Sequence, residues 1–410
     1  MKTAPVQEIA EEPPSNDLGI SDAEDDEPPG MTVTRQLFAS VSPEDWHDWR
    51  WQFKNRITSV EELNEYLPLS GKQQAQLRLV SLKYPFAITP YYLSLIDPAD
   101  LTDPVRAQAI PMAEELTMAG EGLEDPLAEQ EHSVVPGLVH RYPDRVLMVL
   151  TDICPMLCRH CTRKREWRTG VWTRSRAEIQ AMLDYIRRHL EVRDVIISGG
   201  DPLTLSTARL EMVLAELRKI KHVEIVRIGT RCPVVLPQRI DDELCHMLGK
   251  YGPIWLNTHF NHPHEITPEA IRACDKLLRA GVPINNQAVL LKGVNDDLET
   301  QRVLCHGLLR AKVRPYYLFQ CDDVQGTEHF WTSVEKGIQI IEGLRGFTSG
   351  LAVPTYVIDL PCGGGKIPIG PNYVLGHEGG DLLVRNYQGH LMHYKNPGAA
   401  RTICKKQVPA

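Results

Sequence analysis

The chain has 410 residues, of which 42% are hydrophobic and ten are cysteines. That length is sufficient for a large hydrophobic core in one or two domains. No stretch approaches the roughly 20 consecutive apolar residues that a membrane-spanning helix requires. The first residues are acidic and contain no apolar segment, so a secretory signal is not expected, and the cysteines are expected to be reduced thiols or ligands. Together these features predict a cytoplasmic protein.

The formal net charge of −8 is concentrated at the N-terminus. Residues 1–34 contain nine acidic side chains and one lysine, and removing them from the 53 acidic and 45 basic residues leaves 44 of each. A neutral body gives no reason to expect nucleic acid or an anionic membrane as a partner. The acidic segment contains several prolines and few large apolar residues, so it is predicted to be a disordered tail.

A helix is predicted to begin at Ser42. Serine is a suitable N-cap, the proline that follows fits a first helical turn, and the next two acids suit the positive end of the helix dipole. Trp46, Trp49 and Phe53 then form one apolar face at helical spacing. Helical patterns extend to about residue 125, and we therefore expect an N-terminal helical domain over residues 35–135.

From residue 140 onward, short apolar runs alternate with amphipathic helices, one of which is indicated by Ile179, Met182, Leu183, Ile186 and Leu190. The runs expected to be strands are VLMVL at 146–150, DVIIS at 194–198, VEIVRIG at 223–229, IWLNTHF at 254–260, NNQAVLL at 285–291 and RPYYLFQ at 314–320. This alternation predicts parallel strands with right-handed connections, in an open doubly wound sheet or in a complete or partial barrel. Polar motifs follow several of the strands, which favours a barrel.

Four of these polar motifs stand at the ends of predicted strands. They are three cysteines after the first strand, SGGD at 198–201, QCDD at 320–323, and Asp359 with the CGGGK stretch that ends at Lys366 after a last apolar run, TYVI. Loops at the carboxyl ends of parallel strands converge, so the four motifs are expected to share a cavity.

The cysteine motif, CPMLCRHC, places Cys154, Cys158 and Cys161 at C-x-x-x-C-x-x-C spacing with no fourth cysteine nearby. Three thiolates would leave one iron of a four-iron cluster open to a small molecule, and S-adenosylmethionine can occupy that position through its amino and carboxylate groups. The alternative is a structural zinc that is completed by His160 or a distant cysteine. The spacing and the position after the first strand favour the cluster.

The cysteine motif and SGGD together resemble the radical S-adenosylmethionine superfamily. More narrowly, TDICPMLCRHCTRKR, VRDVIISGGDPL, HVEIVRIGTR, PVVLPQRI, WLNTHFNHP, RPYYLFQCD and GGGKIPIGPNY resemble the lysine 2,3-aminomutases, from about residue 35 to about residue 390. The resemblance implies an α/β fold, a partial (β/α)6 TIM-like radical-SAM barrel over residues 136–330 that follows the helical domain. It also implies a C-terminal segment, residues 331–410, that carries a lysine for pyridoxal 5′-phosphate and contacts other subunits.

The resemblance further implies which residues hold the cofactors. The three cysteines would bind a [4Fe–4S] cluster, and Lys366 would form a Schiff base with pyridoxal 5′-phosphate, whereas GGGK alone would be only a weak phosphate-loop signal. The other matching positions are Arg141 and Arg145 for the phosphate of pyridoxal phosphate, and Gly199, Gly200, Asp201, His259 and Gln287 for S-adenosylmethionine. The alternative for the two arginines and the lysine is an ordinary surface side chain. Cys362 stands where relatives tend to have glycine.

The implied reaction moves the α-amino group of L-lysine to the β-carbon through a 5′-deoxyadenosyl radical, giving L-β-lysine. Arg163 matches the partner of the substrate carboxylate, and Asp322 and Asp359 match two carboxylates that bind the distal ammonium. Such an acidic pair speaks against glutamate. Arginine is an alternative substrate, because a guanidinium also pairs with carboxylates and because Phe319 replaces a tyrosine usual in lysine enzymes.

Two other classes of protein would need only part of these motifs. A non-catalytic iron–sulfur electron carrier would not need the lysine, and a pyridoxal enzyme of polar mechanism would not need the three cysteines. An isomerase is therefore expected, with flavodoxin or ferredoxin as electron donor and a dimer or tetramer as its assembly. Structural zinc is not expected, because Asp297 stands where clostridial relatives have a cysteine and the C-terminal end has only Cys404. The remaining cysteines Cys232, Cys245, Cys274 and Cys305 are expected to be core thiols.

Overall fold

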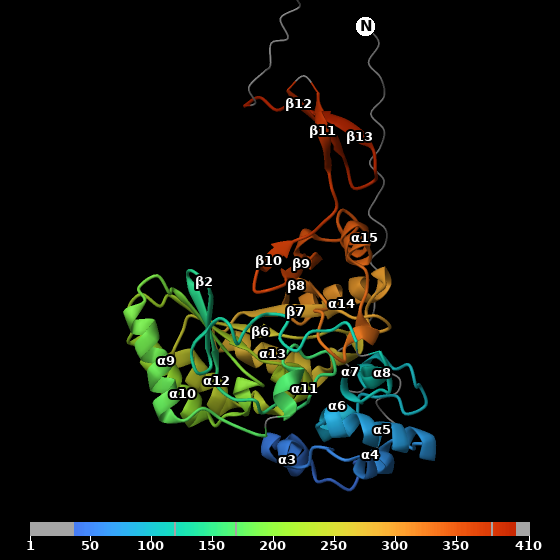
Figure 1. Ribbon diagram of the computed structural model, residues 1–410, viewed down its shortest axis with the longest axis vertical. Coiled ribbons are helices and arrows are strands. Elements are labelled where there is room, and N and C mark those ends of the chain that lie inside the picture. The colour runs from blue at the N-terminus through green and yellow to red at the C-terminus, as the bar shows by residue number, and fades with distance from the viewer. Residues whose placement is uncertain (1–36, 119, 169, 379, 399–410) are drawn as a thin grey trace, which may run out of the picture.

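The computed structural model describes residues 37–118, 120–168, 170–378 and 380–398. The predicted acidic tail, residues 1–34, and Cys404 lie outside the described residues. Figure 1 shows a large α/β body from which a small sheet of three strands projects.

The segment before the central sheet consists of short helices. Ser42 caps the first of them as predicted, since its hydroxyl accepts a hydrogen bond from the backbone N–H of Asp45 at 3.1 Å. The helix expected to carry one apolar face over residues 46–53 is interrupted, because Asp48 adopts an extended backbone and its side chain caps a second helix. Trp46, Trp49 and Phe53 nevertheless all pack against the same hydrophobic core. The helices are α2 (Pro43–His47), α3 (Trp49–Lys54), α4 (Val60–Tyr66), α5 (Gly71–Lys83), α6 (Pro90–Leu93), α7 (Pro104–Ala109) and α8 (Glu114–Thr117).

A ten-stranded sheet forms the centre of the body, with the strands in chain order from β1 to β10. Neighbours from β3 to β9 are parallel, and the pairs β1–β2, β2–β3 and β9–β10 are antiparallel. The strands are β1 (Ser133–Val135), β2 (Leu138–Tyr142), β3 (Arg145–Val149), β4 (Asp194–Ser198), β5 (Ile225–Gly229), β6 (Ile254–Thr258), β7 (Ile284–Leu290), β8 (Arg314–Gln320), β9 (Thr355–Leu360) and β10 (Gly365–Pro368). The described first and last strands do not pair, so the barrel is partial, as predicted.

The six apolar runs predicted as strands form β3 to β8. One face of these strands is fully buried, as Val146, Val195 and Ile197 illustrate with exposures of 1% or less. Residues that alternate with them, such as Leu147 and Ile196, are only partly buried. The connecting helices are α9 (Arg176–Arg188), α10 (Thr207–Arg218), α11 (Cys232–Val235), α12 (Asp242–Lys250), α13 (Pro268–Arg279), α14 (Leu298–Arg310) and α15 (Val334–Leu344). The alternation continues through α15 to β9, and the domain boundary expected at residue 330 stays a prediction.

Helix α9 shows why the sequence pattern succeeded and where it failed. Its buried face comprises Ile179, Met182, Leu183 and Ile186, and burial of each such side chain contributes roughly 1.5–3 kcal/mol. The helix ends before Leu190, which is 70% exposed, so its predicted place on this face is wrong.

The two edges of the open sheet are joined by side chains rather than by strand pairing. The hydroxyl of Tyr142, the last residue of β2, accepts a hydrogen bond from the backbone N–H of Lys366 on β10 at 2.8 Å. Next to it, the guanidinium of Arg141 lies 3.3 Å from the carboxylate of Asp359 on β9. These contacts hold the hairpin at one edge of the barrel against the hairpin at the other edge.

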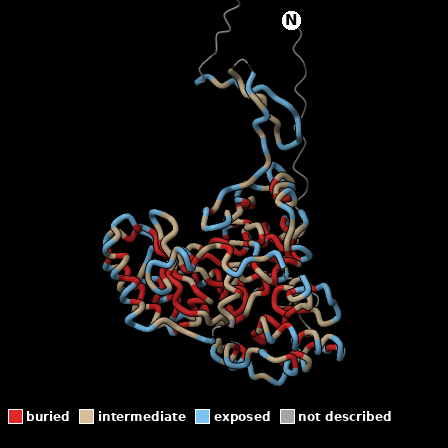
Figure 2. The backbone as a smooth tube through the Cα atoms, viewed as in Figure 1, coloured by how far each residue is buried: buried red, intermediate tan, exposed pale blue. Residues whose placement is uncertain are grey.

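The small sheet stands apart from the barrel. It consists of β11 (Val374–Glu378), β12 (Asp381–Arg385) and β13 (Leu391–Tyr394). Figure 2 shows the buried residues concentrated in the α/β body, whereas this sheet is exposed or intermediate along its length. Its exposed apolar side chains include Leu391, Met392 and Tyr394, each more than half accessible.

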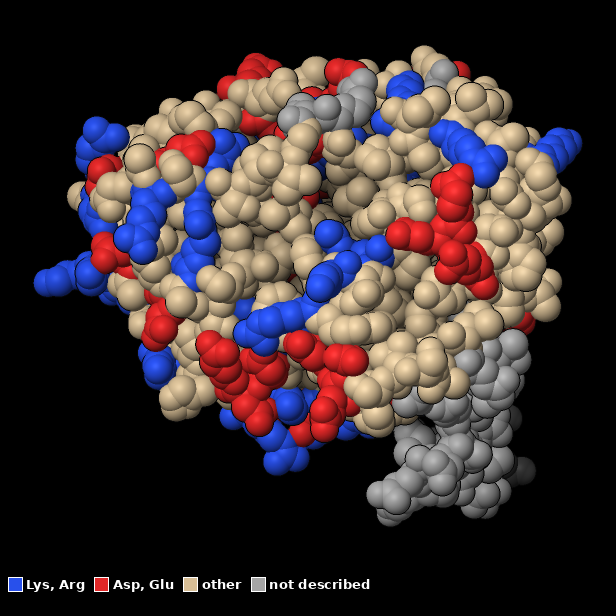
Figure 3. All heavy atoms as spheres, turned by 90° about the horizontal axis from the view of Figure 1, so that it is seen from below, with Lys and Arg blue, Asp and Glu red and all other residues tan. Residues whose placement is uncertain are grey.

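The charged residues of the body are mixed. Figure 3 shows Lys and Arg side chains among Asp and Glu side chains on one face, so that neither sign covers it. This mixture agrees with the neutral body expected from the sequence. Within the described part of the chain, no helix is long and apolar enough to cross a membrane.

Candidate active site

The three cysteines predicted to bind iron lie after β3 in a segment that we call the cysteine loop (residues 154–161). The backbone of the loop is anchored to the N-terminal helical segment. The N–H of Leu157 donates to the carbonyl of Ala87 at 3.0 Å, and the N–H of Arg159 donates to the carbonyl of Gln108 at 2.9 Å. The loop contains no regular helix or strand. Its path is therefore set by these hydrogen bonds to the N-terminal helical segment.

A buried ion cluster reinforces this anchor. The guanidinium of Arg159 lies 2.6 Å from the carboxylate of Glu115 on α8, and the ammonium of Lys164 lies 2.7 Å from the same carboxylate. The Lys164 ammonium also donates to the carbonyl of Gly326 at 2.7 Å. Because breaking a buried ion pair is strongly destabilising, this cluster ties the cysteine loop to α8 and to the segment that follows β8.

The thiols of the cysteine loop influence one another. Burial, and then the neighbouring Cys161, raise the pKa of the Cys154 thiol well above its ordinary value. Burial, and then Cys158, raise the pKa of the Cys161 thiol to about 11. Coordination to a cation would relieve the cost of three close thiolates, and soft sulfur donors suit iron–sulfur chemistry.

The three cysteine sulfurs are therefore chemically suitable ligands for an iron–sulfur cluster. Within the described residues, no group of three or more His, Cys, Asp or Glu side chains is already arranged as a metal site. A second observation favours a bound group beside the loop, since the Nδ1 atom of buried His160 has no hydrogen-bond partner in the described chain. The assignment to iron depends on the spacing, the sulfur donors and this unsatisfied atom.

The SGGD segment lies directly against the residues that precede the cysteines. A Cβ atom at Gly199, which has a φ of 138°, or at Gly200 would clash with the backbone of residues 151–153. The carboxylate of Asp201 accepts hydrogen bonds from the Thr230 hydroxyl at 2.7 Å and from the backbone N–H of Arg231 at 2.8 Å. Asp201 therefore faces protein donors, and it fixes the segment after β5 to the SGGD segment.

A cavity of about 270 Å³ opens beside the cysteine loop and the SGGD segment. Cys154, Cys161, Arg163, Gly199 and Gly200 are among the residues that line it. Two of the four motifs expected to share a cavity thus do so, whereas Lys366 and the two aspartates are not among its lining residues.

Arg163 is held firmly at the edge of this cavity. Its Nε and Nη2 atoms donate to the two carboxylate oxygens of Glu129 at 2.8 and 2.6 Å, and its Nη1 atom donates to the carbonyl of Gly199 at 3.0 Å. Burial alone would raise the pKa of the Glu129 carboxyl, but Arg163 and Arg165 lower it below its ordinary value. Glu129 belongs to no recognisable motif, so the sequence analysis did not identify it as a partner of Arg163.

Lys366 and the acidic residues form a second polar centre. Lys366 pairs with Asp359 in the antiparallel register of β9 and β10, and its Nζ atom lies 2.9 Å from the Asp359 carboxylate. Burial, and then the negative charge of Asp359, raise the pKa of the Asp322 carboxyl to about 7. The Lys366 ammonium also lies 5.1 Å from the centre of the Phe319 ring, within range of a cation–π interaction.

The two arginines predicted to bind phosphate lie around Tyr142. Arg141 contacts Asp359, as described above, and so belongs to the same centre as Lys366. Arg145 stacks over the Tyr142 ring at 4.2 Å, and its side chain is 38% exposed. Tyr142 is the residue that links both arginines to Lys366, and the sequence analysis missed it.

His259 contacts the cysteine loop, whereas Gln287 is placed by its strand pairing. The Nε2 atom of His259 lies 3.1 Å from that of His160, the two rings stack, and both are contacted by the Asn261 side chain. Burial lowers the pKa of both histidines well below the ordinary value. Gln287 is half-buried on β7 beside Tyr317 of β8.

Cys362, in the turn before Lys366, adopts a φ of 55°, a left-handed conformation that favours glycine. This explains in physical terms why glycine suits that position. Asp297, at the position discussed for zinc, caps α14 by accepting the N–H of Thr300 at 2.9 Å. The four cysteines expected to be core thiols are all buried: Cys232, Cys245, Cys274 and Cys305.

Residues 148–302 match the family model of the Radical SAM superfamily, and residues 341–408 match that of Lysine-2,3-aminomutase. The chain is 55% identical over 362 residues to the L-lysine 2,3-aminomutase of Clostridium subterminale, covering 88% of this chain and 87% of the relative. It is 52% identical over 370 residues to the L-lysine 2,3-aminomutase of Acetoanaerobium sticklandii, covering 90% and 89%. It is also 46% identical over 367 residues to the glutamate 2,3-aminomutase of Clostridioides difficile, covering 89% and 87%.

The partial parallel barrel, with three cysteines after one strand and SGGD after the next, is that of a radical S-adenosylmethionine enzyme. The superfamily uses a [4Fe–4S] cluster and S-adenosylmethionine, which confirms these two predicted cofactors. Within it, the chain belongs to the lysine 2,3-aminomutase family and is an isomerase.

Proposed function

We propose that the protein converts L-lysine to L-β-lysine, with pyridoxal 5′-phosphate attached to Lys366 beside the cluster and S-adenosylmethionine. The names of the relatives support lysine, because those from Clostridium subterminale and Acetoanaerobium sticklandii are L-lysine 2,3-aminomutases. The less similar Clostridioides difficile relative is named for glutamate. The side chains around Lys366 supply an independent argument for a cationic substrate.

The observation that carries the proposal is the contact between the Lys366 ammonium and Asp359 at 2.9 Å, with Asp322 in the same electrostatic environment. The side chain of a lysine substrate also ends in a primary ammonium. The contact of Lys366 with Asp359 therefore indicates that this carboxylate can pair with such a group. The second carboxylate of a glutamate substrate would instead be repelled by the two aspartates.

The roles proposed for the nearby residues follow from their contacts. When bound, the cluster and S-adenosylmethionine supply a radical that removes an unactivated hydrogen, and pyridoxal phosphate supplies the site through which the amino group moves. With the Nζ atom of Lys366 engaged by pyridoxal phosphate, the Asp359 carboxylate would be available to the substrate cation. Arg141 and Arg145 would bind the cofactor phosphate, and Tyr142 would hold the backbone of Lys366.

Arg163 is proposed to bind the substrate carboxylate. An arginine has five N–H donors, and Glu129 and Gly199 accept three of those on Arg163. The remaining donors belong to a guanidinium that is already fixed beside the cavity with Cys154 and Cys161. Such a fixed donor loses little side-chain entropy when it binds a carboxylate.

Product analysis tests this function and the arginine alternative together. The protein, reconstituted anaerobically with iron, sulfide and pyridoxal phosphate, would receive S-adenosylmethionine, dithionite and one amino acid: lysine, arginine or glutamate. Faster formation of the β-amino acid from lysine supports the proposal, and faster formation from arginine would reassign the substrate. Absence of any β-amino acid, with only the cluster absorbance present, would instead indicate an electron carrier.

The assembly and the electron donor are also proposals. We infer that the sheet of β11 to β13 contacts a second copy of the chain, since it exposes Leu391, Met392 and Tyr394. The double variant Leu391→Asp/Met392→Asp should then sediment as a smaller species than the parent, and an unchanged sedimentation coefficient would contradict the inference. A flavodoxin or ferredoxin as electron donor and a cytoplasmic location stay predictions.

A further inference from the structure

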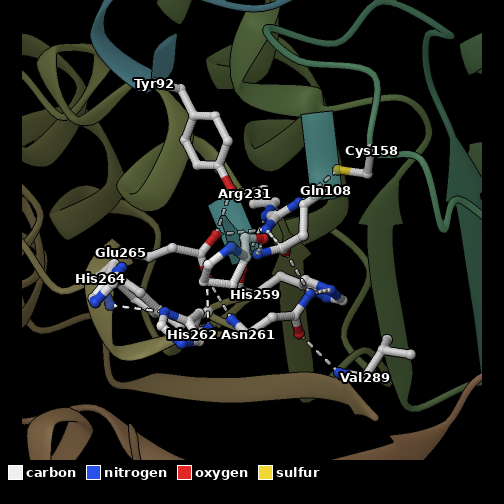
Figure 4. Close-up of polar contacts among 12 residues, drawn as sticks. Tyr92, Gln108, Cys158, Arg231, His259, Asn261, His262, His264, Glu265 and Val289 are labelled. Carbon is white, nitrogen blue, oxygen red and sulfur yellow. Dashed lines mark hydrogen bonds and ion pairs between the residues drawn. The ribbon is translucent and has the colours of Figure 1, made fainter. Parts of the chain in front are cut away.

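A guanidinium contacts one of the three cysteine sulfurs. Arg231 follows β5 at the start of α11, and its side chain is 8% exposed. Its Nη1 atom lies 2.9 Å from the Sγ atom of Cys158, within hydrogen-bond distance (Figure 4). The two residues are separated by 73 positions in the chain, so only the fold brings them together.

Other partners fix the remaining part of the guanidinium. Its Nε atom donates to the carbonyl of His259 at 3.0 Å, and its Nη2 atom donates to the Gln108 side chain at 2.5 Å and to the Glu265 carboxylate at 2.7 Å. The backbone N–H of Arg231 is held by Asp201. With these contacts in place, the guanidinium is preorganised and Nη1 is the atom directed at the sulfur.

Glu265 is itself fixed and inaccessible to water. Its side chain has an exposed fraction of 0%, and it accepts hydrogen bonds from the Tyr92 hydroxyl at 2.7 Å and from the backbone N–H of Asn261 at 2.6 Å. Figure 4 shows Tyr92, Glu265 and Arg231 arranged in sequence toward Cys158. In this ion pair the Arg231 guanidinium lies next to the Cys158 sulfur, and the Glu265 carboxylate lies on the far side of the guanidinium.

We propose that Arg231 sets the reduction potential of the cluster by donating a hydrogen bond to its Cys158 ligand. This inference rests on the proposed function only in that it takes Cys158 to be a cluster ligand. On reduction, the [4Fe–4S] cluster accepts one electron from an external donor, which is dithionite in the experiment below, and no bond breaks. A fixed cation and N–H donor next to a ligand sulfur stabilise the added negative charge and raise the potential.

Glu265 moderates this effect without reversing its sign. Its carboxylate opposes the reduced cluster, but the guanidinium lies between it and the sulfur. Because Coulomb interactions weaken with distance, and are strong in a site that excludes water, the nearer positive charge dominates. Removal of Arg231 should therefore make the cluster harder to reduce.

Arg239 provides a matched control. It is also a buried arginine on the segment after β5, with a side-chain exposure of 0%. Its Nε atom donates to the carbonyl of Leu203 at 2.8 Å, and no hydrogen bond to a sulfur is recorded for it among the described residues. A purely structural role for a buried arginine in this region would affect both positions alike.

The test is an electron paramagnetic resonance redox titration of the anaerobically reconstituted enzyme. The variants are Arg231→Gln, Arg231→Lys and the control Arg239→Gln. The midpoint of Arg231→Gln should shift to a more negative potential than that of the parent, Arg231→Lys should fall between them, and Arg239→Gln should match the parent. Where Arg231→Gln does not retain four irons, the variant Arg231→Gln/Glu265→Gln, which leaves no unpaired carboxylate, should still shift to a more negative potential, but by less than the loss of Arg231 alone because the opposing charge of Glu265 is also removed.

Two results would overturn the inference: equal midpoints for the parent and the Arg231 variants, or an equal shift in Arg239→Gln. Iron and sulfide content of the parent separates this outcome from failure of the proposed function. A parent that binds no four-iron cluster contradicts the role of the cysteines themselves. A loaded parent with unshifted Arg231 variants contradicts only the role of the arginine.

Discussion

The candidate site has a cysteine side, formed by the cysteine loop, and a lysine side, formed by Lys366 with Asp322 and Asp359. Different contacts hold the two sides in place. The cysteine loop is tied to the N-terminal helical segment by backbone hydrogen bonds and by the buried ion cluster of Glu115, Arg159 and Lys164. Lys366 stands on an edge hairpin, and its side chain is 31% exposed and held by a single carboxylate.

The difference matches the tasks proposed for the two sides. A cluster that must pass an electron needs a fixed environment, because its potential depends on nearby charges and hydrogen bonds. The lysine side has to exchange partners, since Asp359 contacts the Lys366 ammonium before the cofactor is attached and would contact the substrate cation afterwards. Contacts between ionic side chains can be exchanged in this way more readily than backbone anchors.

Removing a thiol should have the largest effect on the cysteine side. Alanine at position 154, 158 or 161 removes a cluster ligand, so anaerobic cleavage of S-adenosylmethionine to 5′-deoxyadenosine should fall to background. Chromatographic measurement of 5′-deoxyadenosine provides the readout. Cys274→Ala, which changes a buried core thiol, should retain cleavage. Persistent cleavage in all three ligand variants would show that the cysteines do not hold the cluster.

Lys366→Ala should abolish aminomutase turnover while leaving the cluster absorbance intact, because the change affects only the lysine side. Borohydride reduction of the parent with pyridoxal phosphate, followed by peptide mapping, should place the pyridoxyl mass on the peptide that contains Lys366. Lys336→Ala, on α15, is the matched control and should keep both the label and turnover. A label on another lysine would contradict the assignment.

Neutralising the acidic pair should have an intermediate effect. Asp322→Asn and Asp359→Asn each remove a charge-assisted contact of roughly 1.5–3 kcal/mol. Since about 1.4 kcal/mol corresponds to a factor of ten, each variant should lower kcat/KM for lysine at least about tenfold. The exposed neighbour Asp323 offers a control in Asp323→Asn, which should be close to the parent.

Norleucine sharpens the same experiment, because it lacks the distal cation. It should be a poor substrate of the parent and should lose much less activity in the Asp322 and Asp359 variants. Equal turnover of norleucine and lysine by the parent would mean that the two aspartates do not recognise the side chain.

The smallest expected effect is on the pH dependence of stability. Burial and Asp359 raise the pKa of Asp322 to about 7 in the folded protein, against about 3.9 in an unfolded chain. A carboxyl with a raised folded-state pKa stabilises the fold below its unfolded pKa, and this contribution is lost as the pH rises from about 4 through about 7. The melting temperature of the cofactor-free parent should therefore fall relative to that of Asp322→Asn by about 2 °C or more between pH 5 and pH 8.

Differential scanning fluorimetry at a series of pH values measures this difference, with Asp323→Asn as the control. A gap between the parent and Asp322→Asn that does not change with pH would contradict the raised pKa.

The local parts of the fold were predictable from the sequence. Buried parallel strands are continuous apolar runs, so β3 to β8 were identified within a few residues of their observed ends. The break at Asp48 was missed because an aromatic face at helical spacing does not reveal that a side chain caps a second helix. Leu190 was misplaced because a periodic pattern can continue past the end of a helix.

The site was predictable where its residues belong to motifs and not where they depend on long-range packing. Glu129 reaches Arg163 from 34 positions away, and Arg231 reaches Cys158 from 73 positions away. Asp201 shows the converse, since it is part of a motif but its carboxylate is occupied by Thr230 and Arg231. A single sequence contains no signal for such pairings.

The antiparallel pairing of Lys366 with Asp359 has a consequence for how this region tolerates change. β9 ends at Leu360 and β10 begins at Gly365, so residues 361–364 set which side chain of β10 stands opposite Asp359. Adding or deleting one residue there would rotate the lysine to the opposite face of the sheet, because side chains alternate along a strand. Replacing a residue, as with Cys362, leaves this pairing in register. For engineering, the number of residues in this turn is the first constraint. The second is glycine at position 363, which has a φ of 71° and where a Cβ atom would clash with the His132 ring.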